Sequence, residues 1–230
     1  MANPVFQYSA QFLVSIERTI SKERLSRYLA ATQGDTVKAL ELYEYNVALS
    51  EALYGYLHGF EVAVRNAIHH ELTQAYSTPR WYDSASLGAY HKDKIKEAKA
   101  NAGLNATPGK VIAELSFSFW TGLIAKQYHA SLWTPYLRKA FPNTSLSRGR
   151  VFFRLETIKH LRNRLAHHER ILTSRGELWA GYQRYIKLSD ISECAEWICP
   201  DTARWLMAKF RYREAGMILL RVMTMGVNLV

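Results

Sequence analysis

One short stretch of the chain, residues 160–170, combines imidazoles, guanidiniums and an amide. His167 could exchange protons near neutral pH, and Arg162 or Arg164 could hold a phosphate group. Asn163 could orient the group under attack. These residue types suit cleavage of RNA, because a ribose 2′-hydroxyl attacks the adjacent phosphate once an imidazole has removed its proton. Such a reaction needs no metal ion, and we expect no cofactor.

A helix through this stretch separates polar from apolar side chains. At 100° per residue, His160, Asn163, Arg164 and His167 share one polar stripe. The apolar face is formed by Leu155, Ile158, Leu161 and Leu165.

Arg162 falls within that apolar face, where a guanidinium is costly unless it is paired or directed into a wet cleft. Glu61 and Glu156 are the candidate partners. Arg162 is therefore either a buried ion-pair anchor, with the histidines as ordinary residues at a helix end, or part of a catalytic site. Because one helix supplies only one acid–base set, the catalytic interpretation is easiest with two copies meeting across a two-fold axis.

The positive charge of the chain is concentrated around this segment. Lys and Arg number 30 and Asp and Glu 20, which gives a net charge of +10. Residues 1–115 carry 12 basic and 12 acidic side chains, so the whole excess lies in residues 116–230, with 18 against 8. Between Arg138 and Arg175, arginine outnumbers lysine eight to two, which favours a phosphate-bearing partner over a face that serves only solubility. Candidate substrate contacts in this region are Arg148, Arg150 and Arg154.

The elements expected to position these residues are helical nearly everywhere. Ser21 and Asp35 are typical N-cap residues, and Asp35 begins a long amphipathic helix that reaches about Tyr76. We expect one all-α domain over residues 1–230, with strands minor or absent. Further helices are predicted over 91–102, from 107 through 120, over 132–141, from 147 to about 168, and in two or three segments from 177 to the end.

Composition narrows the class of protein. Apolar residues make up 48% of the chain, which argues against disorder. Cys194 and Cys199 match no zinc or redox spacing, and His160 and His167 lack a third ligand, so no metal site is predicted. The longest apolar run, 217–230, is too short to span a bilayer. We expect a cytoplasmic protein without a membrane partner.

Arg162-Asn163-x-x-x-His167 fits the R-x4–6-H motif, with a polar residue after the arginine, that is the signature of HEPN-domain ribonucleases. More of the chain resembles the Abi-like (abortive infection) branch of that superfamily, with Ser118 and Arg170 departing from its pattern. The similar stretches follow in order over about residues 20–172: Arg24-Leu25-x-x-Tyr28-Leu29, Ala39-Leu40-x-Leu42-Tyr43-x-x-Asn46, 60–69, 114–120 and 161–169.

The resemblance implies an HEPN-like helical bundle over about residues 20–172, on which C-terminal helices from 177–230 pack. It also implies a homodimeric, metal-independent endoribonuclease that acts in phage defence or in a toxin–antitoxin-like module, restrained by a small-RNA or protein antitoxin. By this resemblance, Arg162 and His167 are the catalytic residues and Asn163 supports them. Arg164 and His168 contact the substrate, and the site residues are held in place by Glu61, Arg65 and Asn66.

A function of another class stays open. The same basic surface could belong to a non-catalytic helical module that binds RNA or a protein partner. A DNA-binding regulator would need a helix-turn-helix pattern, which the sequence lacks. Arg65-Asn66 followed by His70 also repeats part of the motif and could form a second half-site.

Overall fold

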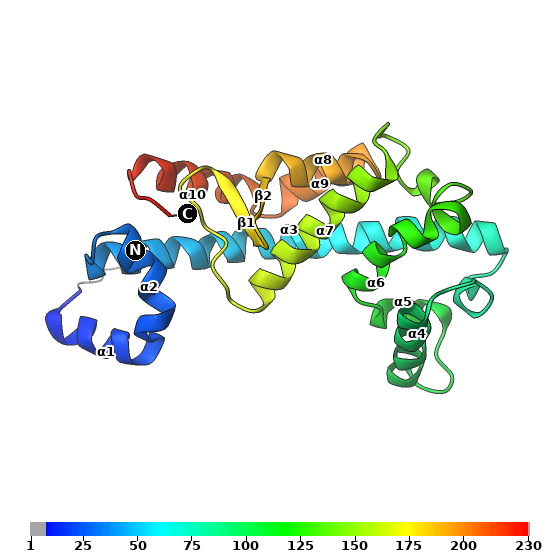
Figure 1. Cartoon of the computed structure of the whole chain (residues 1–230), viewed down its shortest axis with the longest axis horizontal. Coiled ribbons are helices and arrows are strands. Elements are labelled where there is room, and N and C mark those ends of the chain that lie inside the picture. The colour runs from blue at the N-terminus through cyan, green and yellow to red at the C-terminus, as the bar shows by residue number, and fades with distance from the viewer. Residues whose placement is uncertain (1–7, 230) are drawn as a thin grey trace.

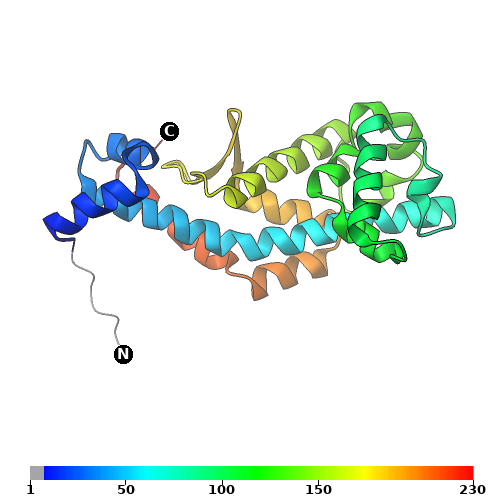
Figure 2. The same ribbon diagram turned by 90° about the horizontal axis from the view of Figure 1, so that it is seen from below.

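The computed structural model describes residues 8–229 and is mostly helical, as the sequence predicts. Helix α3 (Thr36–Tyr76) has 41 residues and runs the length of the molecule, with the other elements packed along it (Figure 1). Helices α1 (Ala10–Ile20) and α2 (Lys22–Ala31) lie at one end of α3, and a cluster of short helices lies at the other (Figure 2). Within residues 8–229, no helix is both long and apolar enough to cross a membrane.

The predicted caps and core stripe of the first helices are confirmed. The Ser21 side chain accepts a hydrogen bond from the Arg24 amide, and the Asp35 side chain accepts one from the Lys38 amide. Each cap satisfies an amide that the first helical turn leaves unpaired. The stripe of α3 that the sequence assigns to the core is buried at every position: Leu53, Tyr56, Leu57, Phe60, Val64, Ile68 and Leu72.

The far end of α3 is less regular than predicted. One helix was expected from 107 through 120, but the chain turns at Leu115 and Ser116, which are extended. This turn buries Phe117, Phe119 and Trp120, and the Trp120 indole donates to the Leu115 carbonyl at 3.2 Å. The helix predicted over 132–141 is also wrong, since short irregular turns occupy that region. The elements here are η1 (Trp81–Asp83), α4 (Ala89–Ala102), α5 (Pro108–Glu114), α6 (Phe117–Gly122), η2 (Lys126–Tyr128), η3 (His129–Trp133) and η4 (Leu137–Ala140).

The C-terminal third contains a β-hairpin where a helix was predicted. Strands β1 (Glu177–Gly181) and β2 (Arg184–Lys187) pair antiparallel, because Tyr182 and Gln183 both adopt positive φ and form a two-residue turn. The Trp179 amide donates to the Ile171 carbonyl at 2.8 Å, which joins the hairpin to the segment after α7. The helices of this region are α7 (Arg148–Ala166), α8 (Leu188–Glu196), α9 (Pro200–Lys209) and α10 (Tyr212–Thr224).

Candidate active site

Helix α7 packs through the apolar face that its sequence predicts. Leu155, Ile158 and Leu161 are fully buried, and Leu165 is 5% exposed. Because these four side chains fix the rotation of α7 about its axis, they also set the direction in which the polar residues of the last turns point.

Arg162 lies at the edge of this face and reaches toward α3. Its side chain is 42% exposed, and its Nε donates to Glu61 Oε2 at 3.1 Å. Its Nη1 lies 3.4 Å from Asn163 Oδ1, and Nη2 has no hydrogen-bond acceptor within residues 8–229. Glu156, the other predicted partner, pairs with Lys159 instead. The predicted ion pair with Glu61 is therefore present, but Arg162 is partly exposed rather than buried, and its guanidinium keeps donors for a ligand.

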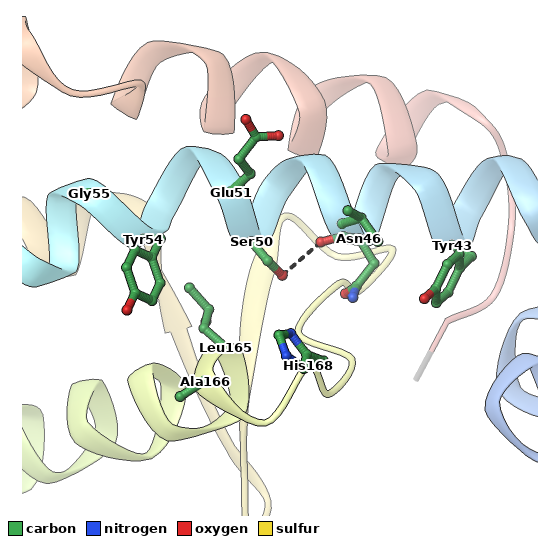
Figure 3. Close-up of a pocket in the computed structure, with 10 residues that line it drawn as sticks. Tyr43, Asn46, Ser50, Glu51, Tyr54, Gly55, Leu165, Ala166 and His168 are labelled. Carbon is green, nitrogen blue, oxygen red and sulfur yellow. Dashed lines mark hydrogen bonds between the residues drawn. The ribbon is translucent and has the colours of Figure 1, made fainter. Parts of the chain in front are cut away.

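Arg162 opens onto a groove between α3 and the C-terminal end of α7, here called the α3–α7 groove. A hollow of about 80 Å³ contains Glu61 and Arg162, and an adjoining hollow of about 680 Å³ contains His168. The two hollows share Tyr54, Leu165 and Ala166 in their linings, so they lie next to each other in this groove. Figure 3 shows Leu165, Ala166 and His168 at the end of α7 facing residues of α3.

The two histidines after α7 face different surroundings. Both are exposed, but His168 lines the α3–α7 groove and His167 lines a separate cleft with several arginines. His167 caps the helix, and His168 takes a left-handed conformation with φ +55°. Amides of His168 and Glu169 then bond back to the carbonyls of Leu165 and Arg164 at 3.0 and 2.9 Å, which is a Schellman motif. The motif fixes the backbone that carries both imidazoles.

The segment that follows is clamped from two sides. Asn46, 4% exposed on α3, accepts hydrogen bonds through Oδ1 from the amides of Ile171 at 2.9 Å and Leu172 at 3.1 Å. Arg24 of α2 donates to the His168 carbonyl. Asn46 belongs to a stretch that the resemblance covers, but it is not among the residues predicted for the site. A polar amide within the buried stripe of an amphipathic helix was the available signal.

Arg164 is engaged inside the chain. Its guanidinium donates twice to the Arg170 carbonyl at 3.0 and 2.9 Å, and it pairs with Glu169 at 2.7 Å. The guanidinium also lies 4.2 Å from the centre of the Trp179 ring. Arg164 therefore holds the end of α7 against β1, and this role was not expected.

The other predicted arginines lie away from the groove. Arg148 donates to the Ile124 carbonyl at 2.7 Å, and Arg154 pairs with Asp190 at 2.6 Å. Arg150 is exposed. Arg148 precedes Arg162 by 14 helical residues, which at 1.5 Å per residue is roughly 21 Å along α7. The structure does not bring these three side chains to the site beside Arg162.

Of the three α3 residues predicted to support the site, Glu61, Arg65 and Asn66, only Glu61 lines the α3–α7 groove. The Arg65 guanidinium donates to Asn66 Oδ1 at 3.1 Å, and Asn66 lines a different hollow, between α3 and α9. His70 is exposed, and neither it nor Arg65 lines the α3–α7 groove.

No group of side chains within residues 8–229 is arranged to hold a metal ion. His160, the other imidazole of α7, packs edge-on against the Tyr182 ring at 5.1 Å. Burial lowers the pKa of His160, and Lys159 and Arg184 lower it further, so this imidazole favours its neutral form.

Comparisons of the chain with family models, with curated proteins and with solved structures find no match. The geometry of the groove and the residues that line it are therefore the basis for assigning a function.

Proposed function

We propose that this protein is a metal-independent endoribonuclease of the HEPN type, with its active site in the α3–α7 groove. Arg162 is the phosphate-binding cation, and Asn163 supports it. The exposed histidines at the end of α7 supply the proton-transfer group. Of the two, the groove favours His168, whose spacing from Arg162 also fits the R-x4–6-H motif.

One observation carries the proposal. The Arg162 guanidinium is held by Glu61, remains 42% exposed, and lines a hollow that adjoins the one that His168 lines. An arginine whose role is only structural gains nothing from partial exposure, because solvent weakens its ion pair to about 0–1 kcal/mol. An arginine that binds a phosphate needs this arrangement, with one edge oriented by a carboxylate and another edge free.

The chemistry follows from these groups. An imidazole removes the proton of a ribose 2′-hydroxyl, and the new bond from O2′ to phosphorus forms as the bond from phosphorus to O5′ breaks. The Arg162 guanidinium stabilises the added negative charge on the phosphorane. A second acid protonates the leaving 5′-oxygen, and we assign it to the same segment of a second copy in a homodimer. The products are a 2′,3′-cyclic phosphate end and a 5′-hydroxyl end.

The test is cleavage of mixed RNA by purified protein in EDTA, with the product ends analysed. Arg162→Ala and His168→Ala should lower the cleavage rate at least about 10²-fold, and His167→Ala should lower it less. His129→Ala, an exposed histidine on η3, is the matched control and should leave the rate unchanged. A wild-type protein that leaves RNA intact would overturn the proposal. Dependence on His167 alone would move the base from His168 to its neighbour.

The second candidate function is a non-catalytic RNA-binding or partner-binding module. It is favoured by the cleft rich in arginine at the end of α7, which is separate from the hollows beside Arg162. This alternative predicts salt-sensitive RNA binding without cleavage, and no effect of either histidine substitution on binding.

We further propose a role as a toxin in phage defence or in a toxin–antitoxin-like module, restrained by a small RNA or a protein antitoxin. Expression of the active protein alone should slow growth, and Arg162→Ala should relieve the effect. Normal growth of cells that express the active protein would contradict both the toxicity and the need for restraint.

A further inference from the structure

Another hollow, of about 360 Å³, lies at the C-terminal end of α7 and is here called the arginine cleft. We propose that it binds a backbone phosphate of single-stranded RNA beside the cleavage site, with Arg27 of α2 as its principal cation. The inference deepens the proposed function and rests on it. The lining includes the four arginines Arg24, Arg27, Arg164 and Arg170, together with His167 and Glu169.

The charge of the cleft is strongly unbalanced. Four guanidiniums from α2, α7 and the following segment face one carboxylate, that of Glu169, which already pairs with Arg164 at 2.7 Å. Burial lowers the pKa of Arg170, and the nearby Arg164 and Arg27 guanidiniums also lower it. Like charges held this close raise the free energy of the empty cleft, and an anion would relieve that cost.

Three of the four arginines donate hydrogen bonds to backbone carbonyls and so stabilise the fold. Arg164 donates to the Arg170 carbonyl, Arg170 donates to the Leu172 carbonyl at 2.7 Å, and Arg24 donates to the His168 carbonyl. Arg164 and Arg170 both lie against the Trp179 ring, at 4.2 and 4.5 Å from its centre. These contacts account for the three side chains without any ligand.

Arg27 is different. It is exposed, it lines the cleft, and within residues 8–229 it makes no hydrogen bond or ion pair. Arg27 lies close enough to Arg170 for the two like charges to repel each other, and no ion pair within the described residues balances its charge. A phosphate oxygen in the cleft would accept hydrogen bonds from Arg27 and offset this repulsion.

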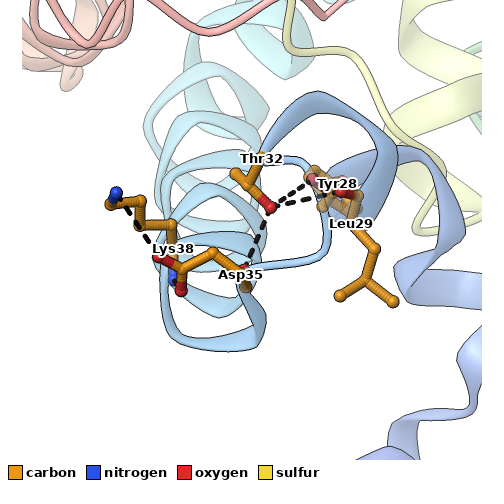
Figure 4. Close-up of polar contacts among 5 residues, drawn as sticks. All are labelled: Tyr28, Leu29, Thr32, Asp35 and Lys38. Atoms are coloured by element: carbon orange, nitrogen blue, oxygen red, sulfur yellow. Dashed lines mark hydrogen bonds and ion pairs between the residues drawn. The ribbon is translucent and has the colours of Figure 1, made fainter.

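The helix that carries Arg27 is firmly placed. The Thr32 hydroxyl lies within hydrogen-bond distance of the carbonyls of Tyr28 at 3.0 Å, Leu29 at 3.3 Å and Asp35 at 3.0 Å (Figure 4). These three contacts join the end of α2 to the start of α3. Arg24 and Arg27 are therefore presented from a fixed helix, and the Arg24 contact ties that helix to the backbone of His168.

The adjacency of the two sites favours RNA over an isolated anion. His167 lines the arginine cleft, and the adjacent His168 lines the α3–α7 groove, so the two sites meet at consecutive residues. A polynucleotide can place neighbouring phosphates in both sites, whereas a single phosphate ion occupies only one.

The experiment measures binding of an oligonucleotide that cannot be cleaved because 2′-O-methyl groups replace its hydroxyls, over a series of salt concentrations. Arg27→Ala should weaken binding about tenfold and lower the slope of log affinity against log salt by about 0.7, as expected for one lost phosphate contact on a single strand. Arg213→Ala is the matched control, an exposed arginine of α10 without a partner within residues 8–229, and should change neither quantity.

The outcomes separate this inference from the proposed function. Unchanged affinity and slope in Arg27→Ala overturn the arginine cleft, even where the wild-type protein cleaves RNA. Weaker binding by Arg27→Ala in a protein that cleaves nothing keeps the cleft as an RNA site and refutes the nuclease. Full competition by millimolar inorganic phosphate would reassign the cleft to a free anion and refute the RNA assignment.

Discussion

Replacement of Asn46 by alanine should release the segment that carries the candidate histidines. The Asn46 side chain is the acceptor for two buried amides, those of Ile171 and Leu172. A buried amide left without an acceptor costs about 1–3 kcal/mol, so Asn46→Ala should destabilise this region by about 2–4 kcal/mol after the backbone relaxes. That free energy corresponds to a roughly 30- to 1000-fold increase in local opening.

Amide hydrogen exchange at Ile171 and Leu172 measures the opening directly, and urea unfolding measures any effect on global stability. Ser50→Ala is the control on the same helix, because the Ser50 hydroxyl donates only to the Asn46 carbonyl of its own helix at 2.8 Å. This control should cost less than about 0.5 kcal/mol. Exchange at both amides that stays at the wild-type rate in Asn46→Ala would refute the clamp.

Three further predictions concern the fold and the groove. Glu61→Gln should change the free energy of unfolding by less than about 1 kcal/mol, because Arg162 is half exposed, but should slow RNA cleavage roughly 10²-fold by misplacing that guanidinium. Equal losses of stability and activity would contradict this. Gln183→Gly should raise the free energy of unfolding by about 1 kcal/mol in urea melts, because Gln183 has φ +57° in the hairpin turn and glycine adopts positive φ at lower cost. A lower free energy of unfolding in this variant would show that contacts of the Gln183 side chain outweigh the backbone strain. His91 is 2% exposed and lies between the Phe119 carbonyl and the Tyr128 hydroxyl. Because burial lowers the pKa of His91 in the folded protein, the imidazole is protonated at a higher pH in the unfolded chain than in the folded one. The contribution of His91 to the free energy of unfolding should therefore be complete above about pH 6.5 and should decline as the pH falls from there to the lower pKa of the folded state. His91→Gln should make this decline between about pH 7 and pH 5 less steep. An unaltered pH profile in that variant would contradict the assignment.

Local signals in the sequence predicted much of the helical frame because they act over a few residues. Caps at Ser21 and Asp35 and the apolar stripe of α3 depend on neighbours within one or two turns. The apolar face of α7 is predictable for the same reason, and the position of Arg162 within it indicated that Arg162 needs a partner, with Glu61 and Glu156 as candidates. That ion pair joins residues 101 positions apart, and the identity of the carboxylate could be decided only by the packing of the two helices.

The failures also have physical causes. The hairpin turn at Tyr182 and Gln183 lacks the Asn or Gly residues that usually mark positive φ, so the sequence around it looked helical. Tertiary burial around Trp120, rather than local propensity, breaks the helix expected through 120.

The distribution of charge along the sequence did not predict where the basic side chains meet in the structure. Residues 1–115 are neutral in sum, which concealed that Arg24 and Arg27 of α2 join the arginines near the end of α7 in one cleft. Conversely, the basic cluster between 138 and 175 is not one surface, because intrachain contacts occupy Arg148, Arg154 and Arg164. Charge along a sequence therefore indicated the kind of partner better than the place where it binds.

The central claim is that a ribose 2′-hydroxyl of the substrate is the nucleophile and that Arg162 and an adjacent histidine promote its attack. The most direct measurement maps a cleavage site in EDTA and then replaces that single ribose by deoxyribose. Cleavage at the altered position should disappear while other sites in the same strand are still cut. Cleavage of the deoxy position at an undiminished rate would mean that another nucleophile attacks, and would contradict the mechanism.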